Sequence, residues 1–239
     1  MPTPTLSAPA PPLVTLHLWR VGAGRVPWAL ARMGVDRGRL RRTPGVRFAK
    51  MLGTGNGRTF TVRDSDPTRW AALVCWASSE AAETARATGV LPEWQRVATE
   101  SWRVDLRPLT SKGRWSGREP FGAPEPLRTD GPVAAVTRAR LTVTKAAGFW
   151  RAVPPVSADL HRSPGLLAAV GIGEAPLGLQ GTFSLWDSAQ SLRDFAHRGA
   201  AHTEVIRRTS EQGWYAEELF ARFAVLSSEG TLDGRDPLG

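Results

Sequence analysis

The sequence has one cysteine in 239 residues, so it can build neither an internal disulfide framework nor a cysteine zinc site. Cys75 lies in the apolar run "AALVCWA", which is typical of a buried core residue. No uncharged apolar stretch approaches the about 18 residues that a membrane-spanning helix requires. The opening "MPTPTLSAPAPP" lacks the basic start of a signal peptide. We therefore expect a cytoplasmic protein with no membrane span.

Lysine is scarce: Lys50, Lys112 and Lys145 are the only ones, and arginine supplies nearly all of the basic charge behind the formal net charge of +9. A basic balance can indicate nucleic acid, a membrane surface or an acidic partner. The densest basic run, "DRGRLRRTPG", is short, is interrupted by glycine and has no aromatic series beside it. This pattern predicts a solvated arginine-rich surface and no nucleic-acid partner. Arginines can also hold carboxylates of a bound ligand.

Apolar residues are plentiful, and their pattern repeats along the chain. They make up 41% of the sequence and include ten tryptophans, which is enough for a substantial core. Pro44-Gly45 recurs as Pro164-Gly165, and Trp76 recurs as Trp186 in similar surroundings. By hydrophobic periodicity, each half follows the order strand, helix, strand, strand, helix, strand. This order is the ferredoxin-like pattern.

Two such units predict an α+β fold in which tandem ferredoxin-like βαββαβ repeats form a pseudo-symmetric dimeric α+β barrel. The Gly- and Pro-rich stretch between the halves is too long for a simple turn, and we expect it to cover a pocket with Trp115, Arg118 or Phe121. By analogy with other barrels we expect a homo-oligomer. The predicted boundaries are residues 1–12 for a flexible lead-in, 13–110 for the first repeat, 111–131 for the linker, 132–228 for the second repeat and 229–239 for a flexible tail.

Two of the four histidines occur in the stretch "FAHRGAAHTEVIRR". His202, Val205 and Ile206 share one face of the helix expected there, opposite a face of glutamate and arginine. In the first half Trp94 stands at the matching position, so an imidazole replaces an indole in the second copy. A buried imidazole needs a partner. One possibility is a hydrogen bond to a backbone carbonyl in a packed core. The other is coordination of a haem iron, which can be held by a single protein ligand. The sequence lacks the spacing of a non-haem iron or zinc site.

The other histidines are weaker candidates. His197 is expected to cap the end of the preceding helix. His161 stands at a turn and His17 on the polar side of the first strand, so both are expected at the surface, with the barrel interior as an alternative for His17. Glu217 and Glu218 are expected to be helix-end residues or arginine partners.

Several blocks resemble the spheroidene monooxygenase family of carotenoid-pathway oxygenases: "TPGVRFAKMLGTGNGRTFT", "GRWSGREPF", "GIGEAPLGLQGTFSLW" and "GWYAEELFARFAVL". The likeness runs from about Leu13 to Leu226, with the blocks in matching order. It implies a dimeric α+β barrel that binds haem b and oxidises an apolar small molecule with dioxygen. Electrons would come from a donor such as ferredoxin. His202 stands where the iron ligand of this barrel class falls.

The resemblance also suggests which side chains surround the cofactor. Glycines in "GIGEAP" permit the close approach of a flat ligand, although such glycines also occur in plain hairpin turns. The predicted cofactor-binding residues are His202, Val205, Ile206, Gly171, Gly173, Trp115 and Phe121, with His202 as the metal ligand. The candidate catalytic polar residues are Arg47, Lys50 and Gln180.

The leading hypothesis is therefore a haem-dependent monooxygenase. Two alternatives remain open on the sequence alone. One is a haem enzyme on the same barrel that dehydrates its substrate or processes an N–O bond. The other is a non-enzymatic ferredoxin-like ligand-binding domain in which His202 is a core residue.

Overall fold

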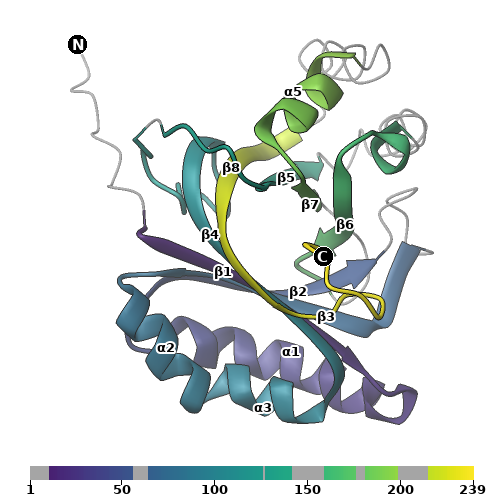
Figure 1. Ribbon diagram of the computed structural model, residues 1–239. Coiled ribbons are helices and arrows are strands. Elements are labelled where there is room, and N and C mark those ends of the chain that lie inside the picture. Colours follow the sequence, from purple (N-terminus) through teal and green to yellow (C-terminus); the bar gives the residue numbers. More distant parts are fainter. Residues whose placement is uncertain (1–10, 56–63, 126, 142–158, 176–180, 199–214) are drawn as a thin grey trace, which may run out of the picture.

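A closed, antiparallel barrel of eight strands forms the centre of the molecule (Figure 1). The computed structural model describes residues 11–55, 64–125, 127–141, 159–175, 181–198 and 215–239. The strands follow the order β1-β3-β2-β6-β7-β5-β8-β4 around the barrel. Their bounds are β1 Leu13–Val21, β2 Val46–Gly55, β3 Ser65–Trp76, β4 Ala98–Gly113, β5 Val133–Leu141, β6 Leu166–Gly173, β7 Gly181–Trp186 and β8 Tyr215–Gly230.

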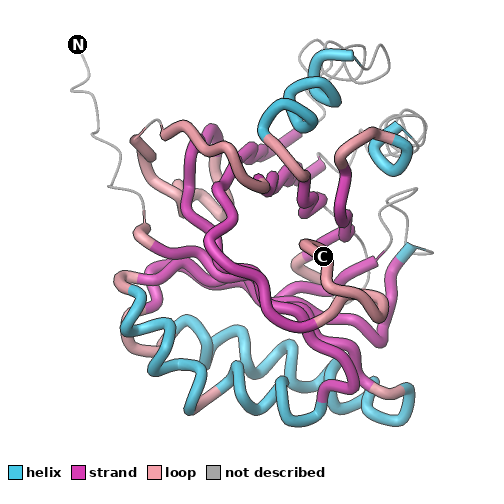
Figure 2. The backbone as a smooth tube through the Cα atoms, viewed as in Figure 1, coloured by secondary structure: helices cyan, strands magenta, loops and turns pink. Residues whose placement is uncertain are grey.

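The first half has the predicted order of strands and helices. Helix α1 (Val26–Arg41) joins β1 to β2, and helices α2 (Ser79–Ala87) and α3 (Val90–Val97) join β3 to β4. A short 3-10 turn, η1 (Ala23–Arg25), precedes α1. The three helices lie together against one face of the sheet (Figure 2). Ser78 begins α2 as an N-cap, because its hydroxyl accepts a hydrogen bond from the amide of Ala81.

The second half repeats the strand order of the first. Strand β5 lies between β8 and β7 as β1 lies between β4 and β3, and β6 follows β7 as β2 follows β3. Helix α5 (Ala189–Arg198) follows β7. Residues 142–158 and 199–214, where the sequence predicts the remaining helical segments, lie outside the described residues. The closed antiparallel barrel is confirmed, whereas the complete second ferredoxin-like repeat stays a prediction.

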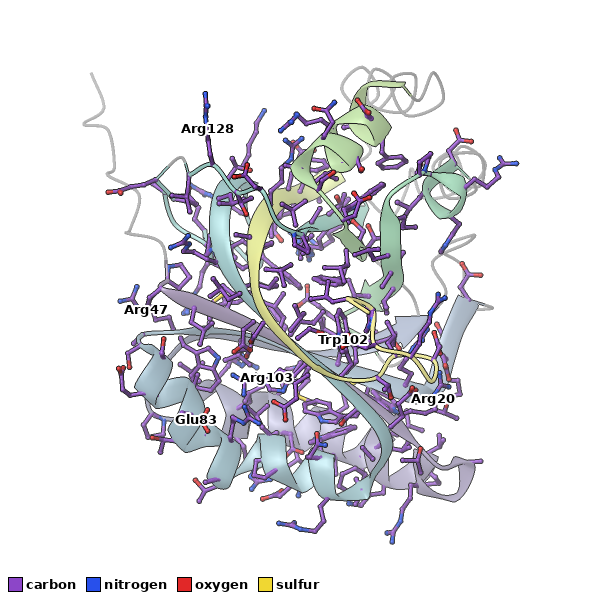
Figure 3. The ribbon with its side chains drawn as sticks, viewed as in Figure 1. Arg20, Arg47, Glu83, Trp102, Arg103 and Arg128 are labelled. Carbon is purple, nitrogen blue, oxygen red and sulfur yellow. The ribbon has the colours of Figure 1, made fainter. Side chains whose placement is uncertain are left out.

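Side chains alternate between the barrel interior and its outer face. On β1, Val14, Leu16 and Leu18 point into the barrel core, whereas Thr15 and Trp19 point outward. The core draws buried residues from all eight strands, including Trp102 and Phe183, whose rings meet edge to face. Trp102 is visible inside the curve of the strands in Figure 3. The interior is therefore filled by side chains, as expected for a barrel of eight strands.

Two structural details differ from the sequence-based expectations. Strand β4 continues to Gly113, so the expected linker begins inside a strand. Strand β8 continues to Gly230, and the expected flexible tail then folds back so that Leu232 enters the barrel core. The physical reason is that Leu232 is apolar, so moving its side chain from water into the end of the barrel stabilises the folded state.

Candidate functional site

The predicted residue Lys50 lies in a compact ionic cluster at one end of the barrel. The Lys50 ammonium donates to the carboxylate of Glu174 and, at 2.6 Å, to the hydroxyl of Ser116. The Arg138 guanidinium donates to Glu174 at 2.8 Å and also to Glu217. The indole Nε1 of Trp115 completes the set by donating to Glu174 at 2.8 Å. The expectation that Glu217 pairs with an arginine is confirmed.

Both acids of this cluster are held in the ionised form. Burial of Glu174 opposes ionisation, but the hydrogen bond and charge of Lys50, with Trp115 and Arg138, bring its pKa below the ordinary value. Burial opposes ionisation of Glu217 as well, yet the backbone amides of Gly117 and Ser116 and the Arg138 side chain lower its pKa. Two cations and two carboxylates thus neutralise one another.

This arrangement fixes structure and offers little room for a ligand. The depression beside Trp115 and Arg138 encloses about 140 Å³, including open solvent, without room for a water molecule. Ligand pockets span about 300–1,000 Å³. The Lys50 ammonium, moreover, is occupied by Glu174. We conclude that the cluster anchors the end of β6, where the Arg37 side chain of α1 also binds the Glu174 carbonyl.

The outer face of the first-half sheet is filled by large side chains. Trp19 stacks on Trp94 of α3 with ring centroids 5.5 Å apart, and Trp70 lies 6.0 Å from the same ring. Met51 and Ala72 complete this packed layer. Trp94, which matches His202 in the sequence repeat, therefore serves as the centre of a helix-to-sheet core.

His17 also belongs to this filled face, which corrects the expectation that it lies at the surface. Its side chain is buried, and its Nε2 lies 3.1 Å from the Thr15 hydroxyl. Burial, with the positive charges of Arg103 and Arg86, lowers the pKa of His17 to about 3. His17 points away from the barrel interior because it alternates with Leu16 and Leu18.

Part of the matching face of the second half carries small side chains, while its other end carries Val133, Leu166 and Trp186. The strand registers match Leu13 with Val133 and Trp76 with Trp186, because these residues pair in the two halves. Counting along the strands from these pairs, Ala139 stands where the first half has Trp19, and Gly171 where it has Met51. Other described outward residues of this face are also small: Ala135, Thr137, Ala169, Thr182 and Ser184. Ala139 and Gly171 are thus smaller than Trp19 and Met51 at the equivalent positions, whereas Trp186 on the same face packs against Phe195 of α5.

The structure places the other predicted site residues in different surroundings. Arg47, labelled in Figure 3, is exposed on β2 and takes part in none of the ion pairs of the Lys50 cluster. Trp115 and Phe121 fill the barrel core, where Phe121 meets Phe223 at 4.9 Å. Strands separate both rings from the outer face. Both side chains close the barrel, and their contact with a cofactor stays a prediction.

Gln180, His202, Val205 and Ile206 lie outside the described residues, as does the side chain of His197. Among the residues that are described, no group of three or more histidine, cysteine or acidic side chains is arranged to hold a metal ion.

No helix in the described part of the chain is long and apolar enough to cross a membrane.

Sequence reasoning missed a second internal repeat, which closes both ends of the barrel. The two closing segments are residues 113–122, "GRWSGREPFG", and 230–239, "GTLDGRDPLG". Ser116 and Asp233 both adopt a φ of 54°, and each segment forms the same antiparallel bridge, Trp115 to Arg118 and Leu232 to Arg235. The shared spacing of three glycines, an arginine and a proline was the available signal.

The Leu232 end has its own ionic cluster. The Arg20 guanidinium contacts Glu100 at 3.2 Å and Asp233 at 2.6 Å, and Arg69 contacts Asp233 at 3.2 Å. Arg20 is seen beside the C-terminal segment in Figure 3. As at the Trp115 end, these contacts connect a closing segment to the strands around it.

No family model matches the chain, but three curated proteins do. The chain is 36% identical over 232 residues to the spheroidene monooxygenase of Rhodobacter capsulatus, covering 95% of each chain. It is 38% identical over 194 residues to that of Rubrivivax gelatinosus, covering 80% of this chain and 73% of the relative. The chain belongs to the spheroidene monooxygenase family.

Family membership makes a monooxygenase-like oxidoreductase the class of this protein. The spheroidene monooxygenase of Cereibacter sphaeroides is 35% identical over 214 residues, which cover 89% of this chain. That match spans 66% of the longer Cereibacter protein. The resemblance seen in the sequence blocks is therefore confirmed at the level of the family.

Solved structures of low sequence identity share the fold. An aldoxime dehydratase matches with a TM-score of 0.56 at 10% identity, covering 89% of this chain and 80% of that one. An aldoxime dehydratase in complex with butyraldoxime matches with a TM-score of 0.57 at 9% identity, covering 93% and 84%. At such identities the likeness concerns the fold alone.

Proposed function

We propose that this protein is a haem-dependent monooxygenase that oxidises a largely apolar small molecule. The relatives' names specify spheroidene, a long apolar polyene, and we extend that class of substrate to this chain. We further propose that residues 13–110 and 132–228 form two ferredoxin-like repeats and that haem b binds to the second. Dioxygen, an external electron donor such as ferredoxin and assembly into a homo-oligomer are parts of the same proposal.

The observation that supports haem is the difference between the two outer sheet faces. The barrel interior is filled, and the first-half face is covered by tryptophans and helices. The second-half face instead carries Ala139 and Gly171 in place of Trp19 and Met51. Small residues at these two positions suit a planar ligand, because a ring could approach the sheet closely there. The residues present therefore fit the group.

Each part of the chain would have a separate role at that face. We propose that His202 holds the iron, that Val205 and Ile206 cover one side of the ring, and that Gly171 and Gly173 allow it to lie against β6. Haem, when bound, supplies the redox chemistry by which dioxygen is activated. Arg47 and Gln180 stay as the polar candidates of this proposal, since Lys50 is neutralised by Glu174.

A spectrum of the purified protein, expressed with haem supply, tests this proposal. We expect a Soret band at about 400 nm that His202→Ala shifts or removes. Ala139→Trp and Gly171→Met rebuild the filled face of the first half and should lower haem content, while remaining folded by circular dichroism. Ala123→Trp, the same bulk at an exposed loop position, is the matched control and should keep full haem content.

Two results would contradict the proposal. One is a parent protein that binds no haem under these conditions. The other is a pair of filled-face variants with unchanged haem content, which would mean that the cofactor lies elsewhere. With haem bound, oxygen consumption in the presence of a reductant separates a monooxygenase from a dehydratase, which consumes none.

A further inference from the structure

The seam between β4 and β8 exposes an outward strip of cations and apolar side chains. On this seam Arg107 pairs with Ala224, Thr110 with Arg222 and Lys112 with Phe220. Directly paired residues of antiparallel strands point to the same face, so these side chains share one surface. Phe220 is 39% exposed. Leu226, which is 50% exposed, lies on β8 beyond Ala224.

The three cations of this seam are not neutralised. Arg107, Lys112 and Arg222 are all exposed, and none has an ion pair with another residue of the described ranges. Elsewhere the described arginines of the barrel strands are commonly paired, as Arg103 is with Asp105 and Arg138 with Glu174. Unpaired cations beside exposed Phe220 and Leu226 favour a partner that carries negative charge at its surface and an apolar layer beneath it.

The seam adjoins the small-residue face to which we assign the cofactor. Strand β8 pairs with β5, so that Arg222 lies opposite Ala135 and Phe220 opposite Thr137. A partner that docks on the seam would therefore lie at the edge of that face.

We propose that the β4–β8 seam docks on an anionic lipid surface and that the apolar substrate enters from there. This inference rests on the proposed function, because a long polyene is carried in a lipid phase and not in water. Arginine, lysine and phenylalanine are suited to this interface, since the cations meet anionic headgroups while the ring reaches the acyl boundary. A second copy of the chain fits less well, because a two-fold contact through the seam would bring its cations together.

Binding to sucrose-loaded vesicles tests the docking surface. The probes are phosphatidylglycerol–phosphatidylcholine vesicles and pure phosphatidylcholine vesicles, and the bound fraction is measured by sedimentation. Each cation near an anionic bilayer contributes roughly fivefold to partitioning. We expect the triple variant Arg107→Gln, Lys112→Gln, Arg222→Gln to bind anionic vesicles roughly 100-fold more weakly than the parent. Phe220→Ser should also weaken binding, including at high salt.

A matched control exists on the opposite side of the molecule. Helix α1 exposes Val35 and Arg41, and its C-cap residue Arg42 is exposed as well, so the first-half helix layer supplies similar chemistry. The variant Val35→Ser, Arg41→Gln, Arg42→Gln should bind vesicles as the parent does. If it loses binding while the seam variant keeps it, the assignment of the surface is wrong.

Other outcomes also decide the matter. Failure of the parent to bind anionic vesicles overturns the proposal, and so does seam-dependent binding of an acidic ferredoxin without any binding of vesicles. Haem content is measured on the same samples. A parent protein that binds haem but not anionic vesicles counts against the docking surface alone, whereas a parent that binds vesicles without haem counts against the proposed cofactor.

Discussion

Glu100 and Glu217 perform the same task at opposite ends of the β4–β8 ladder. Glu217 accepts the backbone amide of Gly117 at 2.7 Å, and Glu100 accepts that of Gly234 at 2.6 Å. Each glutamate also pairs with an arginine of the adjoining strand of the barrel. Equivalent carboxylates thus bind the two closing segments to the strands beside them. We call each glutamate, together with its arginine and backbone-amide partners, a latch.

Neutralising either latch should destabilise the fold and flatten its acid dependence. Hydrogen bonds and arginine charge lower the pKa of Glu100 and Glu217 against the effect of burial. Their contribution is therefore complete above the ordinary value of 4.5 and is lost as the pH falls below it. We expect Glu217→Gln to lower the free energy of unfolding by about 1–3 kcal/mol at neutral pH. Urea unfolding of parent and variant across the acid range measures both effects, and parallel curves would refute the latch.

His17 should make the fold sensitive to mild acid. Its pKa is lowered to about 3 from 6.5, so the folded state disfavours the proton that the unfolded chain accepts. Stability is complete above the unfolded value and falls as the pH drops below it, by up to about 1.4 kcal/mol per pH unit. Replacing His17 with Gln should make this slope shallower in urea titrations. An imidazole resonance of His17 that titrates near the ordinary value would show that the ring is not buried as a neutral group.

Leu232 should contribute to stability although it lies close to the end of the chain. Its side chain is 7% exposed and belongs to the barrel core. Leu232→Ala should lower the free energy of unfolding by about 2–5 kcal/mol. Leu226→Ala removes the same atoms from an exposed position of the neighbouring strand and should cost little. Equal effects of the two substitutions in thermal melts would mean that the closing segment is not packed.

Two glycines of the first closing segment separate backbone strain from steric clash. Gly113 and Gly117 have φ angles of 95° and 72°, which disfavour any side chain. A Cβ at Gly113 would lie 2.2 Å from the Glu218 carbonyl oxygen, whereas one at Gly117 would meet nothing within 4 Å. Gly117→Ala should cost about 1–2 kcal/mol, the strain alone. Gly113→Ala should cost clearly more, as chemical denaturation would reveal.

Much of the architecture followed from patterns that are local in the sequence. The alternation of Val14, Leu16 and Leu18 with Thr15 and His17 predicted which side chains of β1 share a face, because successive side chains of a strand point to opposite faces. The recurrence of Pro44-Gly45 as Pro164-Gly165 predicted matching halves. The family resemblance also rested on local blocks. The copies of the closing segment were equally visible, but the second was assigned to a flexible tail because it is polar.

The candidate site was less accessible to such reasoning. Lys50 was predicted to act on a ligand, yet its partner Glu174 is distant in the sequence, and only the barrel brings them together. His17 is polar and alternates with core residues, so it looked exposed. Helices α2 and α3 cover its face, which no pattern within β1 could reveal. Trp115 likewise was expected to line a pocket, whereas the structure places its ring in the barrel core.

Strand periodicity, the repetition of the strand pattern and the family can be read from the sequence, since each depends on neighbouring residues or on short, ordered blocks. Which faces are filled and which charges meet follows from the closed barrel alone. Trp19 and Ala139 occupy equivalent strand positions, but the packing of such a position depends on the segments that cover the outer face of the sheet, as α3 covers Trp19. Burial and charge pairing are properties of residues far apart in the chain, so they exist only once the barrel has closed.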